Sequence, residues 1–566
     1  MGDIPWLKNY EDGVPSSLAY PPVPLTYFLQ DAAESFPQNV AMIFAGKKVV
    51  YKEFWENVKA LAKALISLGV KKGDRVALLL PNSPPYVIGY YAILKAGGIV
   101  VNLNPLSVER ELFHLLNHAE ARTVIVAEPL FPRIGAIASS CPLQNILVSC
   151  LRDWSAGKSP SNKRRFPIPE EGSRRIYSLE SLIQKHAGQG VPGPDLSPDD
   201  EAVLQYTGAI SDAIRGIVLT HANLVANTMQ ITSWVVRARK GKEVFLSVLP
   251  LYHVYGMAVA MNMPIYLAST MVLLPRFEVR TTLEAIRRYR PTFFAGVPTM
   301  FVALSQGRDA ERYNISSLRV CYSSAGPLST ETQEDFEKLA GARITEGYGL
   351  AEASPATHCN PIFGKRKLGS VGLPYPDTEA RIVDLETGKS ILAPGEVGEL
   401  NIRGPQVMKG YWKMPGETAK AVRHGWLYTG DIARMDEEGY FYILDVMKDM
   451  IIAGGFNIYP KDIDQVLAEH PKVAEAVAVG VPDPHRGETV KAFVVLKPGQ
   501  SATEGEILEF CQKNLAKYKI PTGVEIREFL PKSASGKILR RILRQEELKK
   551  VSDQPPKKDG RQNTEG

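Results

Sequence analysis

The chain has 566 residues, with 67 basic and 61 acidic side chains and a formal net charge of +6. Its 45% hydrophobic content excludes a disordered chain, and the near-balanced charge excludes the basic stripe that a nucleic-acid-binding protein normally carries. The length predicts about three to four domain equivalents, enough for a large core and a second, smaller domain.

Residues 24 to about 98 alternate between segments typical of helices and of strands. Apolar residues recur at helical spacing in PLTYFLQDAAESF and in the segment after VAMIF, whereas VALLL and IVVNL are short, unbroken apolar runs. Continuous apolar strands between helices predict a parallel sheet covered on both faces. The fold class is therefore expected to be α/β in this part of the chain.

Two central stretches differ in composition from the rest. Residues 155–198 are rich in Ser, Pro, Gly and basic residues, which predicts a surface loop or connector. Between Glu243 and Arg276 there is no charged residue, and an uncharged stretch of this length superficially suggests a membrane span. Asn262 and Pro264 interrupt it, so we interpret it as buried core or an apolar ligand pocket. A resting place on a membrane surface is the weaker alternative.

The C-terminal third changes character twice. Short strands separated by turns over residues 377–442 predict antiparallel β structure, in a small barrel-like subdomain. Beyond Asp445 the pattern indicates a separate, small and mobile α+β domain, and the tail from 551 to 566 lacks apolar residues and should be disordered. The expected domains are residues 1–444, 445–550 and the tail.

The five cysteines are scattered, with no CxxC pair and no histidine nearby at metal-ligand spacing. The N-terminus is acidic and lacks the charged-then-apolar pattern of a signal peptide. These features predict a cytoplasmic protein without a transmembrane segment, and peripheral association with the inner membrane surface stays open. The oligomeric state is not readable from the sequence.

A polar segment, YTGAISDAIRGIVLTH, begins at Tyr206 between two apolar runs. Small residues and backbone amides, with Thr207 and Ser211 as donors and Arg215 as a cation, suit a loop that approaches phosphates. Taken alone, the segment is better explained as an ordinary polar hairpin.

Further segments occur along the chain in a recognisable order. They are SSAGPLS from Ser323, EGYGLAEASP from Glu346, YTGD ending at Asp431, DVMKDMIIAGGFNIYP from Asp445 and LPKSASGKILRR around Lys537. Together they resemble the adenylate-forming superfamily of acyl-CoA synthetases, luciferases and peptide-synthetase adenylation domains, from about Pro24 to Gln545. The segments LPLYHVYG, GFNIYP and PKSASGKILRR are similar to those of bacterial long-chain fatty-acid–CoA ligases.

The resemblance implies an enzyme that activates a fatty acid with ATP and Mg²⁺ to an acyl-adenylate and transfers the acyl group to CoA. It implies that Glu352 helps to hold Mg²⁺, that Tyr348 stacks on adenine and that Asp431 accepts hydrogen bonds from ribose. Lys537 would be the catalytic lysine. A carboxylate suits Mg²⁺, and an aromatic ring flanked by two glycines leaves its face open. A helix-capping Glu352, a turn aspartate at 431 and a solvated Lys537 are the structural alternatives.

The remaining expected site residues follow from the same resemblance. His253, with Tyr252 and Gly256, matches the gate beside the acyl pocket, and a core histidine is the alternative. Gly454 and Gly455 match the loop that lines the pantetheine tunnel once the C-terminal domain has swung about the hinge. The other expected cofactor-binding residues are Ala325, Gly326, Gly347, Gly349, Asp445 and Lys448.

The phosphate loop departs from the family pattern. Ala209, Ile210, Asp212 and Arg215 stand where the family has Gly, Thr, Gly and Lys, Ala351 replaces a threonine, and Val446 replaces an arginine. An added carboxylate about 4 Å from a phosphate charge would repel it by about 4 kcal/mol at an effective dielectric of about 20. Arg215 is near enough in sequence to pair with Asp212. The alternative to a ligase is therefore a catalytically impaired paralogue that binds an acyl chain, acyl-adenylate or acyl-CoA. Acyl chain length, and the choice between aliphatic and aromatic acids, are not readable.

Overall fold

The protein is described by a computed structural model covering residues 4–157, 175–190, 193–207, 214–305, 312–326, 328, 330–446, 450–531 and 538–552. The chain forms two compact units, Met1–Lys448 and Asp449–Gly566. Among the described residues, no helix is both long enough and apolar enough to cross a membrane.

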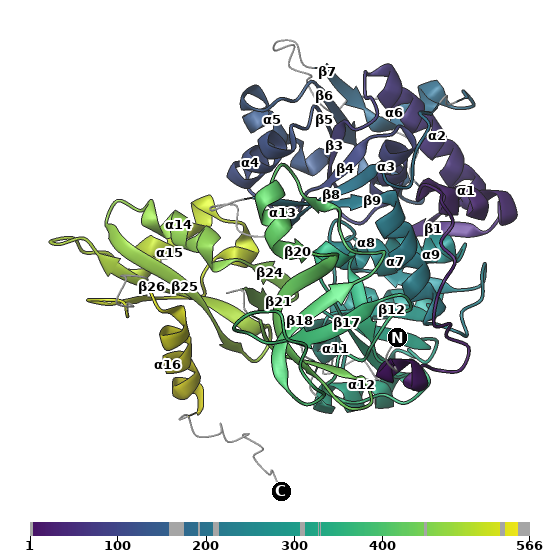
Figure 1. Cartoon of the computed structure of the whole chain (residues 1–566). Coiled ribbons are helices and arrows are strands. Elements are labelled where there is room, and N and C mark those ends of the chain that lie inside the picture. The colour runs from purple at the N-terminus through teal and green to yellow at the C-terminus, as the bar shows by residue number, and fades with distance from the viewer. Residues whose placement is uncertain are drawn as a thin grey trace, which may run out of the picture. The chain divides into compact units, whose positions relative to one another are not determined.

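The first unit contains an eight-stranded sheet (Figure 1). Its strands, in spatial order, are β19 (Gly410–Tyr411), β9 (Arg215–Thr220), β8 (Glu201–Thr207), β4 (Ile99–Asn102), β3 (Arg75–Leu79), β5 (Thr123–Ala127), β6 (Asn145–Ser149) and β7 (Arg175–Ser178). The strands from β8 to β7 in this order pair in parallel, and β9 pairs antiparallel with β8.

Both faces of this sheet are buried. Along β3, Val76 and Leu78 join one apolar cluster, whereas Ala77 and Leu79 join another, as the period of two along a strand requires. The helices α2 (Tyr51–Ser67), α3 (Pro84–Lys95) and α6 (Leu179–His186) contribute to the first cluster, and α4 (Glu109–Ala119) and α5 (Phe131–Ile137) to the second. The predicted α/β class with a doubly covered parallel sheet is confirmed.

A second, nine-stranded sheet completes the α/β part of the first unit. Its strands, in spatial order, are β16 (Leu373–Pro374), β15 (Ala356–Cys359), β14 (Ile344–Gly349), β13 (Val320–Ser323), β12 (Phe293–Gly296), β10 (Val244–Ser247), β11 (Thr270–Leu273), β1 (Val40–Phe44) and β2 (Lys47–Val50). The helices α10 (Val279–Tyr289), α11 (Pro298–Ser305) and α12 (Thr330–Ala340) pack on one face. The other face packs with α1 (Thr26–Ser35) and α7 (His221–Ser233) in the main cluster.

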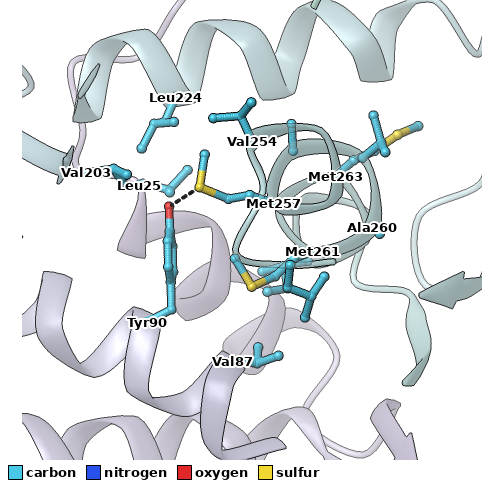
Figure 2. Close-up of a cluster of buried hydrophobic side chains, with 14 of the residues drawn as sticks. Leu25, Val87, Tyr90, Val203, Leu224, Val254, Met257, Ala260, Met261 and Met263 are labelled. Carbon is cyan, nitrogen blue, oxygen red and sulfur yellow. Dashed lines mark hydrogen bonds between the residues drawn. The ribbon is translucent and has the colours of Figure 1, made fainter. Parts of the chain in front are cut away.

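The uncharged stretch lies in the interior of this unit. It forms α8 (Val254–Met257), the π-helical turn η5 (Ala258–Asn262) and α9 (Met263–Tyr266), between β10 and β11. Figure 2 shows Met257 and Met261 among side chains from Leu25, α3 and α7, and the Tyr90 hydroxyl donates a hydrogen bond to Met257 Sδ at 3.4 Å. The interpretation of this stretch as buried core is supported.

The expected connector over residues 155–198 is partly wrong. Residues 158–174 lie outside the described part of the chain, but residues 175–186 form strand β7 and helix α6. The strand RIYS is held by parallel pairing with β6, and Ser178 caps the N-terminus of α6, where its hydroxyl accepts a hydrogen bond from the amide of Ser181. Pairing with the neighbouring strand, which the composition does not reveal, determines the structure of this segment.

Residues 379–446 form the antiparallel sheet that the strand pattern predicts. Its strands are β17 (Glu379–Val383), β18 (Val397–Arg403), β20 (Val422–Arg423), β21 (Trp426–Met435) and β22 (Phe441–Val446). The short helix α13 (Pro415–Ala421) precedes β20. The short helical turn η7 (Ala351–Ala353), which is important for the site, comes directly after β14.

The second unit is α+β. A five-stranded sheet contains β24 (Phe456–Ile458), β23 (Ile451–Ala453), β26 (Gly487–Leu496), β25 (Val473–Asp483) and β27 (Gly523–Ile526). Its helices are α14 (Pro460–Ala468), α15 (Glu504–Asn514) and α16 (Arg540–Ser552), with the short turn η8 (Lys517–Lys519). Residues 553–566, most of the expected disordered tail, lie outside the described part of the chain.

Candidate active site

The expected phosphate loop joins the antiparallel strands β8 and β9. Thr207 pairs with Arg215 across the base of this hairpin, so the strands flanking the loop are where the sequence predicts them. Residues 208–213, with Ala209, Ile210, Ser211 and Asp212, lie outside the described part of the chain.

Arg215 has a described partner that the sequence did not reveal. Its Nη2 donates to Glu417 Oε2 of α13 at 3.1 Å, and its guanidinium lies 5.6 Å from the centre of the Tyr411 ring. The Arg215 and Glu417 side chains are 38% and 29% exposed, so the pair is open to solvent and to ligands. Arg215, at the base of the loop, is therefore partly neutralised by a carboxylate from a distant segment.

Glu352 lies in η7 and is 7% exposed. Its Oε1 accepts a hydrogen bond from the Tyr411 hydroxyl at 2.9 Å, and it does not cap the helical turn that contains it. The helix-capping alternative is therefore wrong. A buried, oriented carboxylate fits the role of one protein ligand to a Mg²⁺ ion carried by nucleotide phosphates, which supply most of the other ligands. Among the described residues, no group of three or more His, Cys, Asp or Glu side chains would hold a metal without them.

Tyr348 and Asp431 come together from separate sheets. The Tyr348 hydroxyl, on β14, donates to Asp431 Oδ2, on β21, at 2.5 Å, although the residues are 83 positions apart. Burial, reinforced by the Asp431 charge, raises the pKa of Tyr348 well above its ordinary value, so the hydroxyl stays a donor. The carboxylate is thereby fixed beside the aromatic ring that is expected to meet adenine.

Asp431 lies inside a strand, not in a turn. It falls in the middle of β21, just after Gly430 with a φ of +73°, and its amide donates to the Thr429 hydroxyl at 3.0 Å. The register between β21 and β22 shifts next to it, between Ile432 and Ala433. The turn alternative is therefore wrong.

The glycines on either side of Tyr348 have a packing role. A Cβ atom at Gly349 would lie 2.1 Å from the carbonyl oxygen of Pro355, and one at Gly347 would lie 3.1 Å from that of His358. Both glycines allow the neighbouring backbone to approach β14. Ala325, with a φ of +67°, and Gly326 follow β13, at the end of the strand beside β14.

The residues expected at the acyl gate cluster around the start of α8. His253 Nδ1 accepts the amide hydrogen of Tyr255 at 3.3 Å and caps this helix, and burial lowers the pKa of His253 to about 4. The carbonyl of Tyr252 accepts from Gln205 Nε2 at 3.2 Å, on β8. A Cβ atom at Gly256 would lie 2.2 Å from the carbonyl oxygen of Pro250. His253 is therefore neutral near pH 7 and acts at least as a helix cap.

The expected thioester-stage residues fall near the boundary and in the second unit. Gly454 and Gly455, with φ of +59° and +83°, form the turn between β23 and β24, and the Gly454 amide donates to the Arg486 carbonyl at 2.8 Å. The backbone of Asp445 pairs with that of Ile432 in β22 and β21. Lys448 and Lys537 lie outside the described part of the chain.

Comparison with known proteins decides the family. The family described as AMP-binding enzyme matches residues 29–412, and the AMP-binding enzyme C-terminal domain matches residues 462–537. The chain belongs to the AMP-binding enzymes. The two matched segments of this AMP-binding enzyme lie in separate compact units, residues 1–448 and 449–566.

Curated relatives of this AMP-binding enzyme include several that are named long-chain-fatty-acid–CoA ligase. That of Bacillus subtilis (strain 168) is 43% identical over 96% of this chain and 98% of its own length, and that of Escherichia coli O157:H7 is 37% identical over 97% and 99%. A structure of a long-chain-fatty-acid-CoA ligase from Archaeoglobus fulgidus matches with a TM-score of 0.72 at 26% identity, over 92% of this chain and 99% of that one. A double mutant of the o-succinylbenzoate CoA synthetase from Bacillus subtilis matches with a TM-score of 0.76 at 28% identity, over 92% and 98%.

Two residues at the site of this AMP-binding enzyme were not predicted from the sequence. Tyr411 contacts Glu352 from 59 positions away, and Glu417 contacts Arg215 from 202 positions away. The available signal was an aromatic residue directly after Gly410, in the segment MKGYWKMPGE. Such a signal does not say which carboxylate or cation the side chain meets.

Glu346, at the centre of β14, predicts a pH dependence of stability. Burial raises its pKa to about 7, opposed by hydrogen bonds from the amides of Leu328 and Gly369. Because the folded state binds this proton more tightly than the unfolded state, its contribution is complete below pH about 4.5 and is lost as pH rises through about 7. As the pH rises from about 5.5 to about 8, loss of the Glu346 proton should lower the free energy of unfolding by about 1–2 kcal/mol. Denaturant unfolding of Glu346→Gln should lack this part of the pH slope, and an unchanged slope would contradict the assignment.

Proposed function

We propose that the chain activates a fatty acid in two steps, using ATP, Mg²⁺ and CoA. A carboxylate oxygen of the acid attacks the α-phosphorus of ATP and pyrophosphate leaves, giving the acyl-adenylate. The CoA sulfur then attacks the acyl carbon and AMP leaves, giving acyl-CoA. The observation that carries this proposal is the convergence of Tyr348 and Asp431, at 2.5 Å, from β14 and β21. Full-length similarity to named long-chain ligases supports the acid substrate.

The residues of the first unit have separate tasks in this scheme. Asp431 would accept hydrogen bonds from the ribose hydroxyls. Tyr348 would present its ring to adenine while its own hydroxyl restrains Asp431. Glu352 would hold Mg²⁺, whose charge offsets that of the phosphates. Neutralising two anions that repel each other is the main demand of the first step, so fixed charges matter more than proton transfer.

The second unit would supply Lys537 to the first step and the Gly454–Gly455 turn to the second. The two positive φ angles at this turn, +59° and +83°, are accessible to glycine at little cost, and side chains at both positions would be strained. A turn free of side chains suits close passage of the pantetheine arm. Lys448 and Asp445 would act at the hinge.

The acyl chain would be received by the buried, uncharged region around α8, η5 and α9. Met257, Met261 and Met263 belong to the apolar cluster of this region (Figure 2), and their unbranched side chains rearrange more readily than branched ones. The neutral His253 at the N-terminus of α8 adds no charge that an apolar chain would have to desolvate.

A second candidate function is a binding protein for acyl-adenylate or acyl-CoA. The pairing of Arg215 with Glu417 favours it, because this cation at the base of the loop is already engaged by a carboxylate. The substitutions Ala209, Ile210, Asp212, Ala351 and Val446 point in the same direction, since each removes a donor, a cation or close backbone approach expected at the phosphates.

Pyrophosphate exchange separates the two candidates. The ligase proposal expects fatty-acid-dependent exchange of labelled pyrophosphate into ATP by the natural protein, with little change on combining Asp212→Gly with Ala351→Thr. Absence of exchange in the natural protein, with recovery in the double variant, would overturn the proposal. Tight binding of a non-hydrolysable acyl-adenylate analogue alongside weak binding of ATP would then support the binding protein.

A further inference from the structure

A short strap, residues 408–412, connects the two parts of the candidate phosphate site. The amide of Met408 donates to the carbonyl of Glu352 at 2.8 Å. On the other side, the amides of Lys409 and Trp412 donate to Val218 and Gly216 of β9, at 3.0 and 2.7 Å. The strap is therefore fixed by backbone bonds both to η7 and to the strand that leaves the phosphate loop.

Tyr411 is the central side chain of the strap. It is 7% exposed, and β19 places its backbone opposite Ile217 of β9. Its amide donates to the Thr418 hydroxyl of α13 at 2.9 Å, and its own hydroxyl donates to Glu352 Oε1 at 2.9 Å. The ring is thus held at both ends, by backbone pairing and by the carboxylate.

The hydrogen bond from Tyr411 leaves most of the carboxylate available. The hydroxyl occupies one lone pair of Glu352 Oε1, leaving Oε2 and the second lone pair of Oε1 for a cation. A hydrogen bond to one oxygen also restricts rotation of the carboxylate about its last bond.

The same ring separates the two opposite charges of the site. Glu352 is bonded to the hydroxyl, while the Arg215 guanidinium lies 5.6 Å from the ring centre and is held by Glu417. Without the hydroxyl, Glu352 would be free to adopt other rotamers. Groups that orient a metal ligand in this way typically change metal affinity about 10- to 100-fold when removed.

We propose that Tyr411 is a positioning residue that fixes the carboxylate of Glu352 for the Mg²⁺ ion bound to the nucleotide phosphates. This inference rests on the proposed function, since it assigns a partner to the proposed metal ligand. Tyr411 itself touches neither the acid nor the nucleotide in this scheme.

The test is Tyr411→Phe in the full chain, with binding of a non-hydrolysable ATP analogue measured by calorimetry at increasing Mg²⁺. We expect the Mg²⁺ concentration for half-maximal tight binding to rise about 10-fold, within the range seen for such groups. Binding of AMP without Mg²⁺ should change less than about twofold, which a general loss of structure would not permit. The matched control is Tyr440→Phe, because Tyr440 is fully buried and its hydroxyl donates to the Lys365 carbonyl at 2.8 Å.

A double-mutant cycle with Glu352→Gln makes the inference specific. Because the hydroxyl acts through the carboxylate, Tyr411→Phe should have little further effect in the Glu352→Gln background. An equal Mg²⁺ shift in both backgrounds, or a shift in Tyr411→Phe no larger than in Tyr440→Phe, would overturn the inference alone. Absence of Mg²⁺-dependent nucleotide binding in the unchanged protein would overturn the proposed function and the inference with it.

Discussion

Glu352→Gln is expected to slow fatty-acid-dependent pyrophosphate exchange by about 100- to 1,000-fold, the range found when a fixed charge that stabilises a transition state is removed. Glu352 is 7% exposed and its carboxylate is oriented by the Tyr411 hydroxyl at 2.9 Å, so the substitution removes a ligand that is held in place. Glutamine keeps the shape and one acceptor but loses the charge that Mg²⁺ prefers. The measurement is the initial rate of exchange at saturating acid over a range of Mg²⁺ concentrations.

Glu379→Gln is the matched control for this prediction. Its carboxylate is 50% exposed and pairs with Arg403 on the neighbouring strand, so the same chemical change there should leave the exchange rate within about twofold. Raising Mg²⁺ should recover part of the rate in Glu352→Gln and none in the control. An exchange rate in Glu352→Gln equal to that of the control would contradict the assignment of Glu352 as a metal ligand.

Lys519→Met is expected to destabilise the second unit by about 3–5 kcal/mol, the usual cost of removing one partner of a buried ion pair. Lys519 Nζ lies 2.9 Å from Asp462 Oδ2, and the two residues are 4% and 5% exposed. The pair joins η8 to the first turn of α14. Without the lysine, the Asp462 carboxyl group stays in a buried position and loses the cation that faces it.

Hydrogen exchange of amides in β25 and β26 measures this effect within the second unit, even in a chain whose two units need not unfold together. At 1.4 kcal/mol per tenfold, exchange through global opening of this unit should be about 100- to 4,000-fold faster in the variant. Lys513→Met is the control, because Lys513 pairs with Glu509 at an exposed site. Adding Asp462→Leu to Lys519→Met should restore part of the loss. Equal exchange in Lys519→Met and Lys513→Met would contradict the prediction.

The strand pattern was readable where local signals agree with packing. VALLL became β3 and IVVNL lies in and around β4, because an unbroken apolar run between helices is stable when both faces of the strand are covered. The strands that flank the phosphate loop, β8 and β9, were predicted for the same reason. The short strand β7 was not predicted. Its four residues are exposed or half-buried, and they form a strand because they pair with β6.

The roles of individual side chains were less accessible than the elements. The sequence does not distinguish between the roles that a histidine such as His253 can have. Its burial and its capping of α8 are consequences of the packed structure. The same holds for Asp431, which the preceding Thr-Gly makes typical of a turn but which lies within β21. Local residue preferences are weak priors that strand pairing overrides.

The sequence by itself determined the α/β class, the order of the motifs and the identities of the candidate site residues, because periodicity and motif chemistry are properties of short segments. Only the tertiary structure decided which groups meet: Tyr348 with Asp431, Tyr411 with Glu352 and Glu417 with Arg215, at separations of 83, 59 and 202 residues. Such contacts depend on the register of β19 against β9 and on the packing of β14 beside β21, and no local pattern encodes either of them. The charge around the phosphate loop is therefore a property of the fold, in which a carboxylate from α13 faces the arginine that the loop sequence supplies.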